Sequence, residues 1–110
     1  MTPSLATVDI VHTSAVGTLA VVRGELDMSN AADVDRRLRG HLPAGGGTTV
    51  VDLAEVTYLD SSGLRLLANL AQDPSLTLVV VAPAGGTARQ AIAASRLDQH
   101  LDVRDRMPEP

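Results

Sequence analysis

The stretch VVDLAEVTYLDSSGL, residues 50–64, decides how this 110-residue chain is interpreted. Thr48 and Thr49 precede its apolar first residues, and together they predict a short buried strand over residues 48–53. Residues 54–59 lead into Asp60-Ser61-Ser62-Gly63, and a helix with an apolar stripe follows from Leu64. The stretch therefore predicts a strand-to-helix junction at residues 60–63, where backbone N–H groups lack helical partners.

Two strands are predicted before this stretch and one after it. Residues 7–12 alternate in polarity, which is typical of an edge strand, whereas residues 18–23 are apolar on both faces. A turn is expected at residues 13–17 and a loop at residues 24–28. The most hydrophobic strand is predicted over residues 76–82, after Asp73-Pro74 ends the preceding helix.

Two more helices are predicted from the spacing of small and apolar residues. Ser29 is a plausible N-cap for the first, which Pro43 and three glycines terminate. Its apolar stripe is Ala31, Val34, Leu38 and Leu42. The second follows the loop at residues 83–86, and its Thr87 and Gln90 match a capping box.

The segment after that last helix is expected to pack only in part. Leu97 and Leu101 should contact the core, and residues 104–110 are predicted to form a frayed tail. The whole order is β-β-α-β-α-β-α, which predicts a largely parallel arrangement with right-handed crossovers and an antiparallel edge from the first hairpin. We therefore expect one α/β domain over residues 1–110, with a core at about 5–103. Its helices should pack against a small mixed sheet of four to five strands.

Composition removes several classes of protein. The chain has no cysteine, which excludes disulfides, thiolate zinc sites and catalytic thiols, and fits a cytoplasmic protein. Its longest apolar run, residues 78–82, is far shorter than the roughly 20 residues of a membrane span, and residues 1–4 do not resemble a signal peptide. A net charge of −4 without any lysine argues against direct binding to nucleic acid.

The motifs expected of an enzyme are missing as well. Leu59 stands where a G-x-S-x-G elbow needs glycine, and the glycines at 45–47 lack the Lys-Ser/Thr of a phosphate loop. The three histidines, His12, His41 and His100, have no metal-ligand spacing. We therefore expect no catalytic residue, no metal and no cofactor.

Two interpretations remain open for Asp60-Ser61-Ser62-Gly63. In the first, Asp60 or Ser61 is an ordinary N-cap and Gly63 allows close packing. In the second, an exposed serine at the helix start is phosphorylated, which adds about −1.5 to −2 charges and three acceptor oxygens. The fold would then change little, whereas a partner surface pressed on Ser61 would change greatly. Tyr58, the lone aromatic residue, precedes the junction, and we expect its packing to fix the loop.

Residues 50–64 resemble the signature of STAS domains, specifically of bacterial anti-sigma factor antagonists. Residues 23–27, Arg-Gly-Glu-Leu-Asp, resemble the family's other hallmark, a loop after the second strand. Residues 78–103 are similar to its last strand, third helix and following segment. The resemblance covers roughly residues 5–103, and the two motifs in this order and spacing are fairly specific.

The resemblance implies a phosphorylation-switched binding module and no enzyme. Such a protein binds an anti-sigma factor that is also a serine kinase, and so frees a sigma factor for transcription, for example in a stress response. The kinase, using ATP that it binds itself, phosphorylates the first serine of the D-S-S-G motif, here Ser61, and is then released. A phosphatase, of the PP2C type, resets the cycle. The implied docking residues beside Ser61 are Asp27, Met28, Ser29, Asn30, Asp60, Ser62 and Gly63.

The chain departs from the family pattern at Arg96, where a glycine is usual. A helix C-cap with φ > 0 would be strained by arginine. The chain also stops at Pro110, which leaves little room for the family's final helix. Two alternatives are kept: a non-switching STAS subunit of a transport or signalling complex, and a small enzyme that would need a general base near Ser61.

Overall fold

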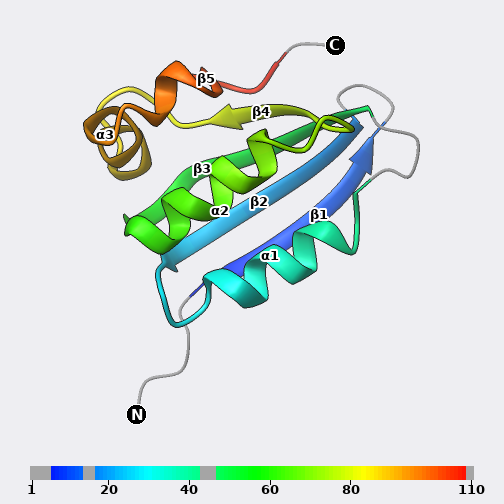
Figure 1. The fold of residues 1–110 in the computed structure, drawn as a ribbon, viewed down its shortest axis with the longest axis horizontal. Helices are drawn as coiled ribbons and strands as arrows, with labels where there is room; N and C mark the ends of the chain where they lie inside the picture. Colours follow the sequence, from blue (N-terminus) through cyan, green and yellow to red (C-terminus); the bar gives the residue numbers. More distant parts are fainter. Residues whose placement is uncertain (1–5, 14–16, 43–46, 109–110) are drawn as a thin grey trace.

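The computed structural model describes residues 6–13, 17–42 and 47–108, and it shows helices packed against one twisted sheet (Figure 1). The strands are β1 (Thr7–Thr13), β2 (Gly17–Leu26), β3 (Thr48–Leu59), β4 (Thr77–Val81) and β5 (Asp102–Arg104). The helices are α1 (Ala31–Arg39), α2 (Ser61–Ala71) and α3 (Thr87–Ala94), with a 3₁₀ turn at Leu97–Gln99. The predicted order of elements is confirmed, and β5 adds the fifth strand.

The sheet has the order β1-β2-β3-β4-β5, with β1 antiparallel to β2 and all other neighbours parallel. The predicted mixed sheet with an antiparallel edge is therefore confirmed. Because β2 and β3 are parallel, their carboxyl ends meet at the same edge of the sheet, and Leu26 pairs with Leu59 there. The loop after β2 and the start of α2 consequently lie next to each other.

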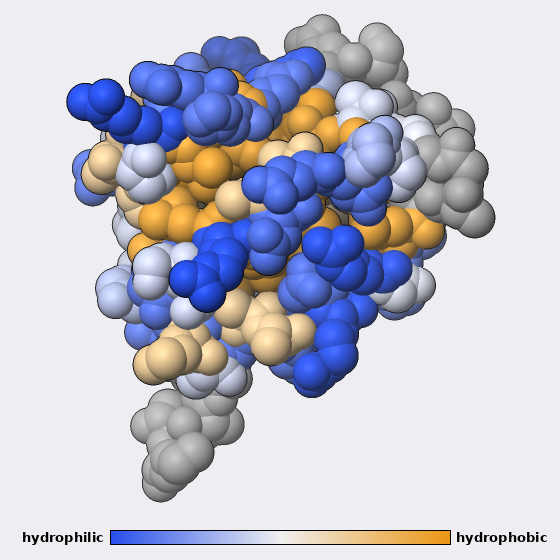
Figure 2. All heavy atoms as spheres, viewed as in Figure 1, coloured by the Kyte–Doolittle hydropathy of each residue, from blue (hydrophilic) through white to orange (hydrophobic). Residues whose placement is uncertain are grey.

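The core lies between the sheet and the helices. Alternate residues of β2 face it, and α1 buries three residues of its predicted stripe, Ala31, Val34 and Leu38. Leu53, Leu67 and Ile92 are almost completely buried, and each buried side chain of this size contributes about 1.5–3 kcal/mol. Apolar side chains show between the helices, and polar ones cover much of the outer surface (Figure 2).

A second, smaller apolar cluster lies on the other face of the sheet. Val50, Val79 and Val81 are buried there, with Leu19 and Met107 packed against them. Residues 104–110 were predicted to form a frayed tail. That prediction is wrong for Arg104, which lies in β5, and Met107 packs against the second cluster. Asp105, next along the chain, accepts hydrogen bonds from the Ala84 N–H (3.1 Å) and the Arg89 guanidinium (2.9 Å).

Three strands are longer than predicted, β1 by one residue and β2 and β3 by more, and the expected loop at residues 24–28 is wrong for its first three residues. β2 continues to Leu26 because it pairs with the second half of β3, which was expected to be a connection. The pairing shifts register between Gly24 and Glu25, and Gly24 has φ +89°, which a bulge tolerates in glycine. The β2–α1 loop is therefore short and starts at Asp27.

The two caps predicted for α1 and α3 are wrong. Asn30 and not Ser29 precedes α1, and its side chain makes no capping bond. Gly86 precedes α3, which begins at Thr87, so the capping box is not formed. Gln90 Nε2 instead donates to the Gly85 carbonyl at 3.4 Å.

Other predicted boundaries are partly outside the described residues. α1 ends at Arg39, so Leu42 lies beyond it. The turn predicted at residues 13–17 is wrong at its ends, because Thr13 lies in β1 and Gly17 in β2. Residues 14–16 of that turn and residues 43–46 of the break after α1 lie outside the described part. Leu97 and Leu101 pack against the core as predicted. No helix in the described ranges is long and apolar enough to cross a membrane.

The strain predicted at Arg96 is confirmed. Arg96 has φ 62° and ψ 19°, in the left-handed region, and is the one non-glycine residue with positive φ in the described part of the chain. Arg96 lies between α3 and the 3₁₀ turn at Leu97–Gln99. Glycine would adopt this left-handed conformation without steric cost.

Candidate docking site at the start of α2

Asp60 holds the site together. It precedes α2 with extended backbone (φ −100°, ψ −171°), and its Oδ1 accepts from the N–H groups of Ser62 (2.8 Å) and Gly63 (3.2 Å). Its other carboxylate oxygen accepts from the N–H of Met28 at 3.1 Å. The predicted N-cap role of Asp60 is therefore confirmed, and the same side chain also fixes the β2–α1 loop.

The two serines of the motif occupy different environments. Ser61 is the first residue of α2 and is exposed, and no described residue accepts from or donates to its hydroxyl. Ser62 is half-buried, and its N–H is bound by Asp60. Of the two hydroxyls, the one on Ser61 is the more accessible to a partner.

Gly63 is required by the close approach of α2 to the ends of β2 and β3. A Cβ atom at this position would lie 2.3 Å from Leu59 Cδ1, 3.1 Å from Leu26 Cγ and 3.2 Å from the Leu26 carbonyl oxygen. Both leucines are buried, so neither can move aside freely. This contact brings the first turn of α2 against the sheet and sets the position of Ser61.

The β2–α1 loop is shaped by its own polar side chains. Asp27 Oδ1 accepts from the Ser29 N–H (2.9 Å) and hydroxyl (2.6 Å). Asn30 is only 4% exposed; its Oδ1 accepts from the Asp27 N–H (3.0 Å) and its Nδ2 donates to the Glu25 carbonyl (2.8 Å). Asn30 therefore supports the loop from beneath, while Asp27, Met28 and Ser29 form its outer part.

Two exposed large hydrophobic side chains belong to the segments that meet at the start of α2, Met28 to the β2–α1 loop and Tyr58 to the end of β3. Met28 is 81% exposed and Tyr58 is 49% exposed, and they are two of the three large hydrophobic residues exposed in the described structure. The hydrogen bond from Met28 shows that Asp60 holds the loop, and a contribution from the packing of half-exposed Tyr58 stays a prediction. Tyr58 was not predicted as a docking residue, although a lone aromatic beside a motif serine is a usable signal.

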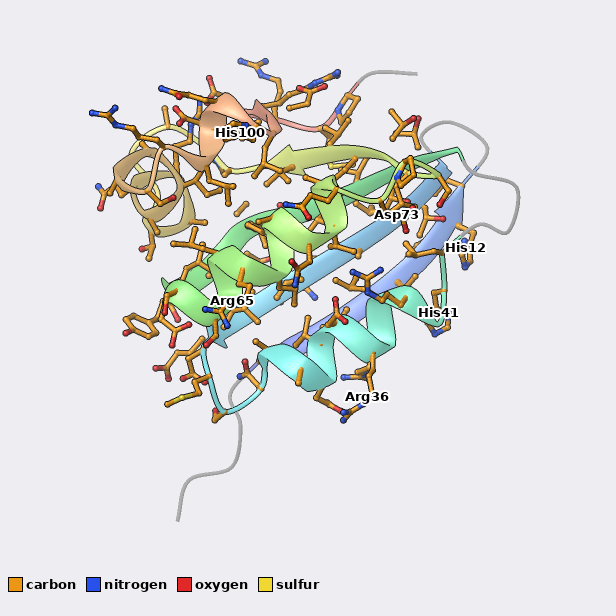
Figure 3. The ribbon with its side chains drawn as sticks, in the orientation of Figure 1. His12, Arg36, His41, Arg65, Asp73 and His100 are labelled. Carbon is orange, nitrogen blue, oxygen red and sulfur yellow. The ribbon has the colours of Figure 1, made fainter. Side chains whose placement is uncertain are left out.

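A shallow groove of about 290 Å³ runs between α1 and α2 from this loop. Its lining residues are Met28, Ala31, Ala32, Asp35, Ser62, Arg65, Leu66 and Asn69. Arg65 belongs to the N-terminal half of α2, and its side chain lies toward the β2–α1 loop (Figure 3). Sequence reasoning missed Arg65, because nothing in its neighbourhood along the chain marks it as unusual.

The histidines lie elsewhere. His12 and His41 come close to each other, with ring centroids 6.3 Å apart, and His12 Nδ1 lies 3.2 Å from Thr18 Oγ1. Figure 3 shows this pair near the opposite end of the sheet from Arg65. The described residues contain no group of three or more side chains suited to hold a metal ion.

Two carboxyl groups away from the docking loop have lowered pKa values. A hydrogen bond from the Ser75 side chain lowers the pKa of Asp73, and one from Arg104 lowers the pKa of Asp102. These shifts belong to the α2–β4 connection and to β5. The hydrogen bonds that cause them stabilise these two segments and do not involve Ser61.

Comparison with known proteins agrees with this geometry. Residues 8–105 match the model of a family described as "Mlab, STAS domain". The structure is similar to that of an anti-sigma factor antagonist from Mycobacterium paratuberculosis, with a TM-score of 0.82 and 25% sequence identity over 93% of this chain and 87% of that one. Because the family model spans nearly the whole described sheet and its helices, the chain belongs to the STAS-domain family.

Proposed function

We propose that this chain is an anti-sigma factor antagonist whose binding surface is centred on Ser61. The likeness to an antagonist of the same fold supports the general role. One observation carries the proposal: the exposed hydroxyl of Ser61 stands at the first residue of α2, with exposed Met28 and Tyr58 nearby. Exposed methionine and aromatic side chains are enriched at protein-binding surfaces relative to the rest of a protein surface.

The proposed partner is an anti-sigma factor that is also a serine kinase. The Ser61 oxygen would attack the γ-phosphorus of ATP bound by that kinase, the bond to the β–γ bridging oxygen would break, and ADP would leave. The hydroxyl proton would pass to a base on the kinase, because the neighbouring carboxylate of Asp60 already accepts three backbone N–H groups. The domain itself would supply only the acceptor oxygen and the docking surface.

Phosphorylation would switch binding without refolding the domain. A phosphate of charge about −1.5 to −2 pressed against a partner surface that fits a neutral hydroxyl would lose its hydration and meet no compensating charge on that partner. A cost of about 3 kcal/mol would weaken binding roughly a hundredfold. Hydrolysis of the phosphoserine by a PP2C-type phosphatase would restore the binding form, so that sigma-factor-dependent transcription in the cytoplasm follows the phosphorylation state.

The proposal is tested by recovering the partner. The chain, tagged and purified from its native cells, should bring down an ATP-binding kinase, and mass spectrometry after incubation with ATP should find one phosphate on Ser61. Ser75→Ala, an exposed serine in the α2–β4 connection, is the matched control: it should be phosphorylated on Ser61 at the parent rate, whereas Ser61→Ala should not be phosphorylated. Recovery of a membrane ATPase in place of the kinase would favour the non-switching transport subunit.

A further inference from the structure

Arg65 is a cation that the described structure leaves without a carboxylate partner. Five of the arginines, Arg23, Arg36, Arg39, Arg89 and Arg104, form ion pairs, and Arg65 is not among them. It is exposed on α2 and lines the groove that starts at the docking loop. The guanidinium of Arg65 is therefore available to an anionic group at the rim of the proposed binding surface.

The carboxylates near Arg65 are already engaged. Asp35 lines the same groove, but both of its oxygens accept from Arg39 Nε at 3.1 Å. Asp60 accepts three backbone N–H groups, those of Met28, Ser62 and Gly63. Neither carboxylate needs Arg65, and neither is bound to it.

Arg65 lies four residues after Ser61 on the same helix. Residues separated by four positions share one face of an α-helix, with Cβ atoms about 5–6 Å apart, and an acidic group N-terminal to a basic one is the favourable orientation. The long arginine side chain can therefore reach a phosphate on Ser61. Ser61 is exposed at the first position of the helix, so the phosphate would stand in the open beside Arg65.

The backbone at the start of α2 cannot fully meet the needs of such a phosphate. The N–H groups of Ser62 and Gly63 are occupied by Asp60, and the Asp60 carboxylate repels a second anion. A side-chain cation is needed to offset this repulsion. Resting on the proposed function, we propose that Arg65 is the intramolecular counter-ion of phosphorylated Ser61.

This pairing gives the switch a second electrostatic part. In the unphosphorylated protein, Arg65 offers a free positive charge at the rim of the docking surface. After phosphorylation, the same guanidinium is held by the phosphate and is lost to the partner. Phosphorylation thus changes the surface in two ways: it places a bulky phosphate where the partner fits a hydroxyl, and it occupies the guanidinium that the partner would otherwise contact.

The test uses the full chain with phosphoserine incorporated at position 61 during translation, so that no kinase is needed. The second pKa of the phosphate is measured by ³¹P NMR at low salt in the parent, in Arg65→Gln and in Arg65→Lys. An adjacent cation favours the dianion, so Arg65→Gln should raise this pKa by about 0.3 pH unit and Arg65→Lys should keep most of the parent value. The difference should shrink in 1 M salt.

Arg37→Gln is the matched control, because Arg37 is exposed on α1, forms no ion pair among the described residues and does not line this groove. It should leave the phosphate pKa unchanged. Equal phosphate pKa values in the parent and Arg65→Gln, with circular dichroism showing both folded, would overturn the pairing. Because the phosphate is incorporated during translation, this result does not depend on whether a kinase phosphorylates Ser61. The proposed function is tested separately, by the partner experiment above.

Discussion

The backbone N–H of Met28 donates to the carboxylate of Asp60 over 3.1 Å and joins two segments that lie 32 residues apart in the chain. The same carboxylate caps α2 through Ser62 and Gly63. One side chain therefore does two things: it starts the helix that presents Ser61, and it holds the neighbouring loop against that helix.

Substitution of Asp60 by asparagine should separate these two roles. Asparagine is a good N-cap, so one oxygen can still serve α2, but its NH₂ group cannot accept from Met28. We expect Asp60→Asn to cost less than about 1 kcal/mol, whereas Asp60→Ala should cost about 1–2 kcal/mol. Native-state hydrogen exchange should show the Met28 amide exchanging faster in both variants.

Asp73→Ala is the control for that measurement. Asp73 also accepts a backbone bond, from the Ser75 N–H at 2.9 Å, but in the α2–β4 connection. It should leave the exchange of Met28 unchanged. An Asp60→Asn protein with the parent exchange rate at Met28 would show that the carboxylate does not hold the loop.

Asn30→Ala should destabilise the domain although Asn30 lies in a surface loop. The side chain is buried, and its loss leaves the Asp27 N–H and the Glu25 carbonyl without their partner, at a cost of about 1–3 kcal/mol. Urea unfolding followed by circular dichroism measures this. The exposed neighbour Ser29→Ala should change stability by less than about 0.5 kcal/mol, and equal effects of the two substitutions would contradict the supporting role.

Gly63→Ala should lower stability despite the better helix propensity of alanine. Alanine gains up to about 1 kcal/mol in a helix interior, but its Cβ would overlap buried Leu59 and Leu26 and cost about 1–3 kcal/mol. Gly40→Ala is the matched control, because φ is −68° there and the nearest atom to a Cβ, the Arg36 carbonyl oxygen, is 3.4 Å away. Thermal melting should show Gly63→Ala below the parent and Gly40→Ala at or above it; the reverse order would refute the close-approach explanation.

Arg96→Gly should stabilise the domain. Arginine pays about 1–2 kcal/mol for a left-handed conformation, and glycine avoids this cost but loses more entropy on folding. The net gain should be about 0.5–1 kcal/mol. Chemical denaturation measures it, with the exposed Arg106→Gly as control for the loss of charge; a less stable Arg96→Gly protein would mean that the Arg96 side chain makes a contact that outweighs its strain.

Much of the fold could be predicted because patterns along the chain were strong. The alternation in residues 7–12, the apolar run before Pro83 and the helix stripe from Ala31 to Leu38 each depend on local periodicity, and each element formed as expected. The capping role of Asp60 was likewise a local signal, since the carboxylate bonds backbone groups two and three residues ahead. The strain at Arg96 could be predicted because Arg96 stands at a position where the family usually has glycine.

The errors arose where tertiary pairing overrides local pattern. Nothing near Gly24 shows that β2 continues past it, because the continuation depends on the second half of β3. Ser29 was a reasonable N-cap on composition, but Asp27 binds it. Tyr58 and Arg65 could not be identified from the sequence, because their roles depend on the tertiary structure. Tyr58 is exposed near the start of α2. Arg65 is left without a carboxylate partner because Asp35 binds Arg39.

The most direct test of the central claim is the affinity of this chain for the anti-sigma kinase proposed as its partner, once recovered, with and without phosphate on Ser61. Isothermal titration calorimetry would compare the unphosphorylated protein with the protein that carries phosphoserine at position 61. We predict binding that is weaker by roughly a hundredfold or more for the phosphorylated form. Equal affinities for the two forms would contradict a switch at Ser61.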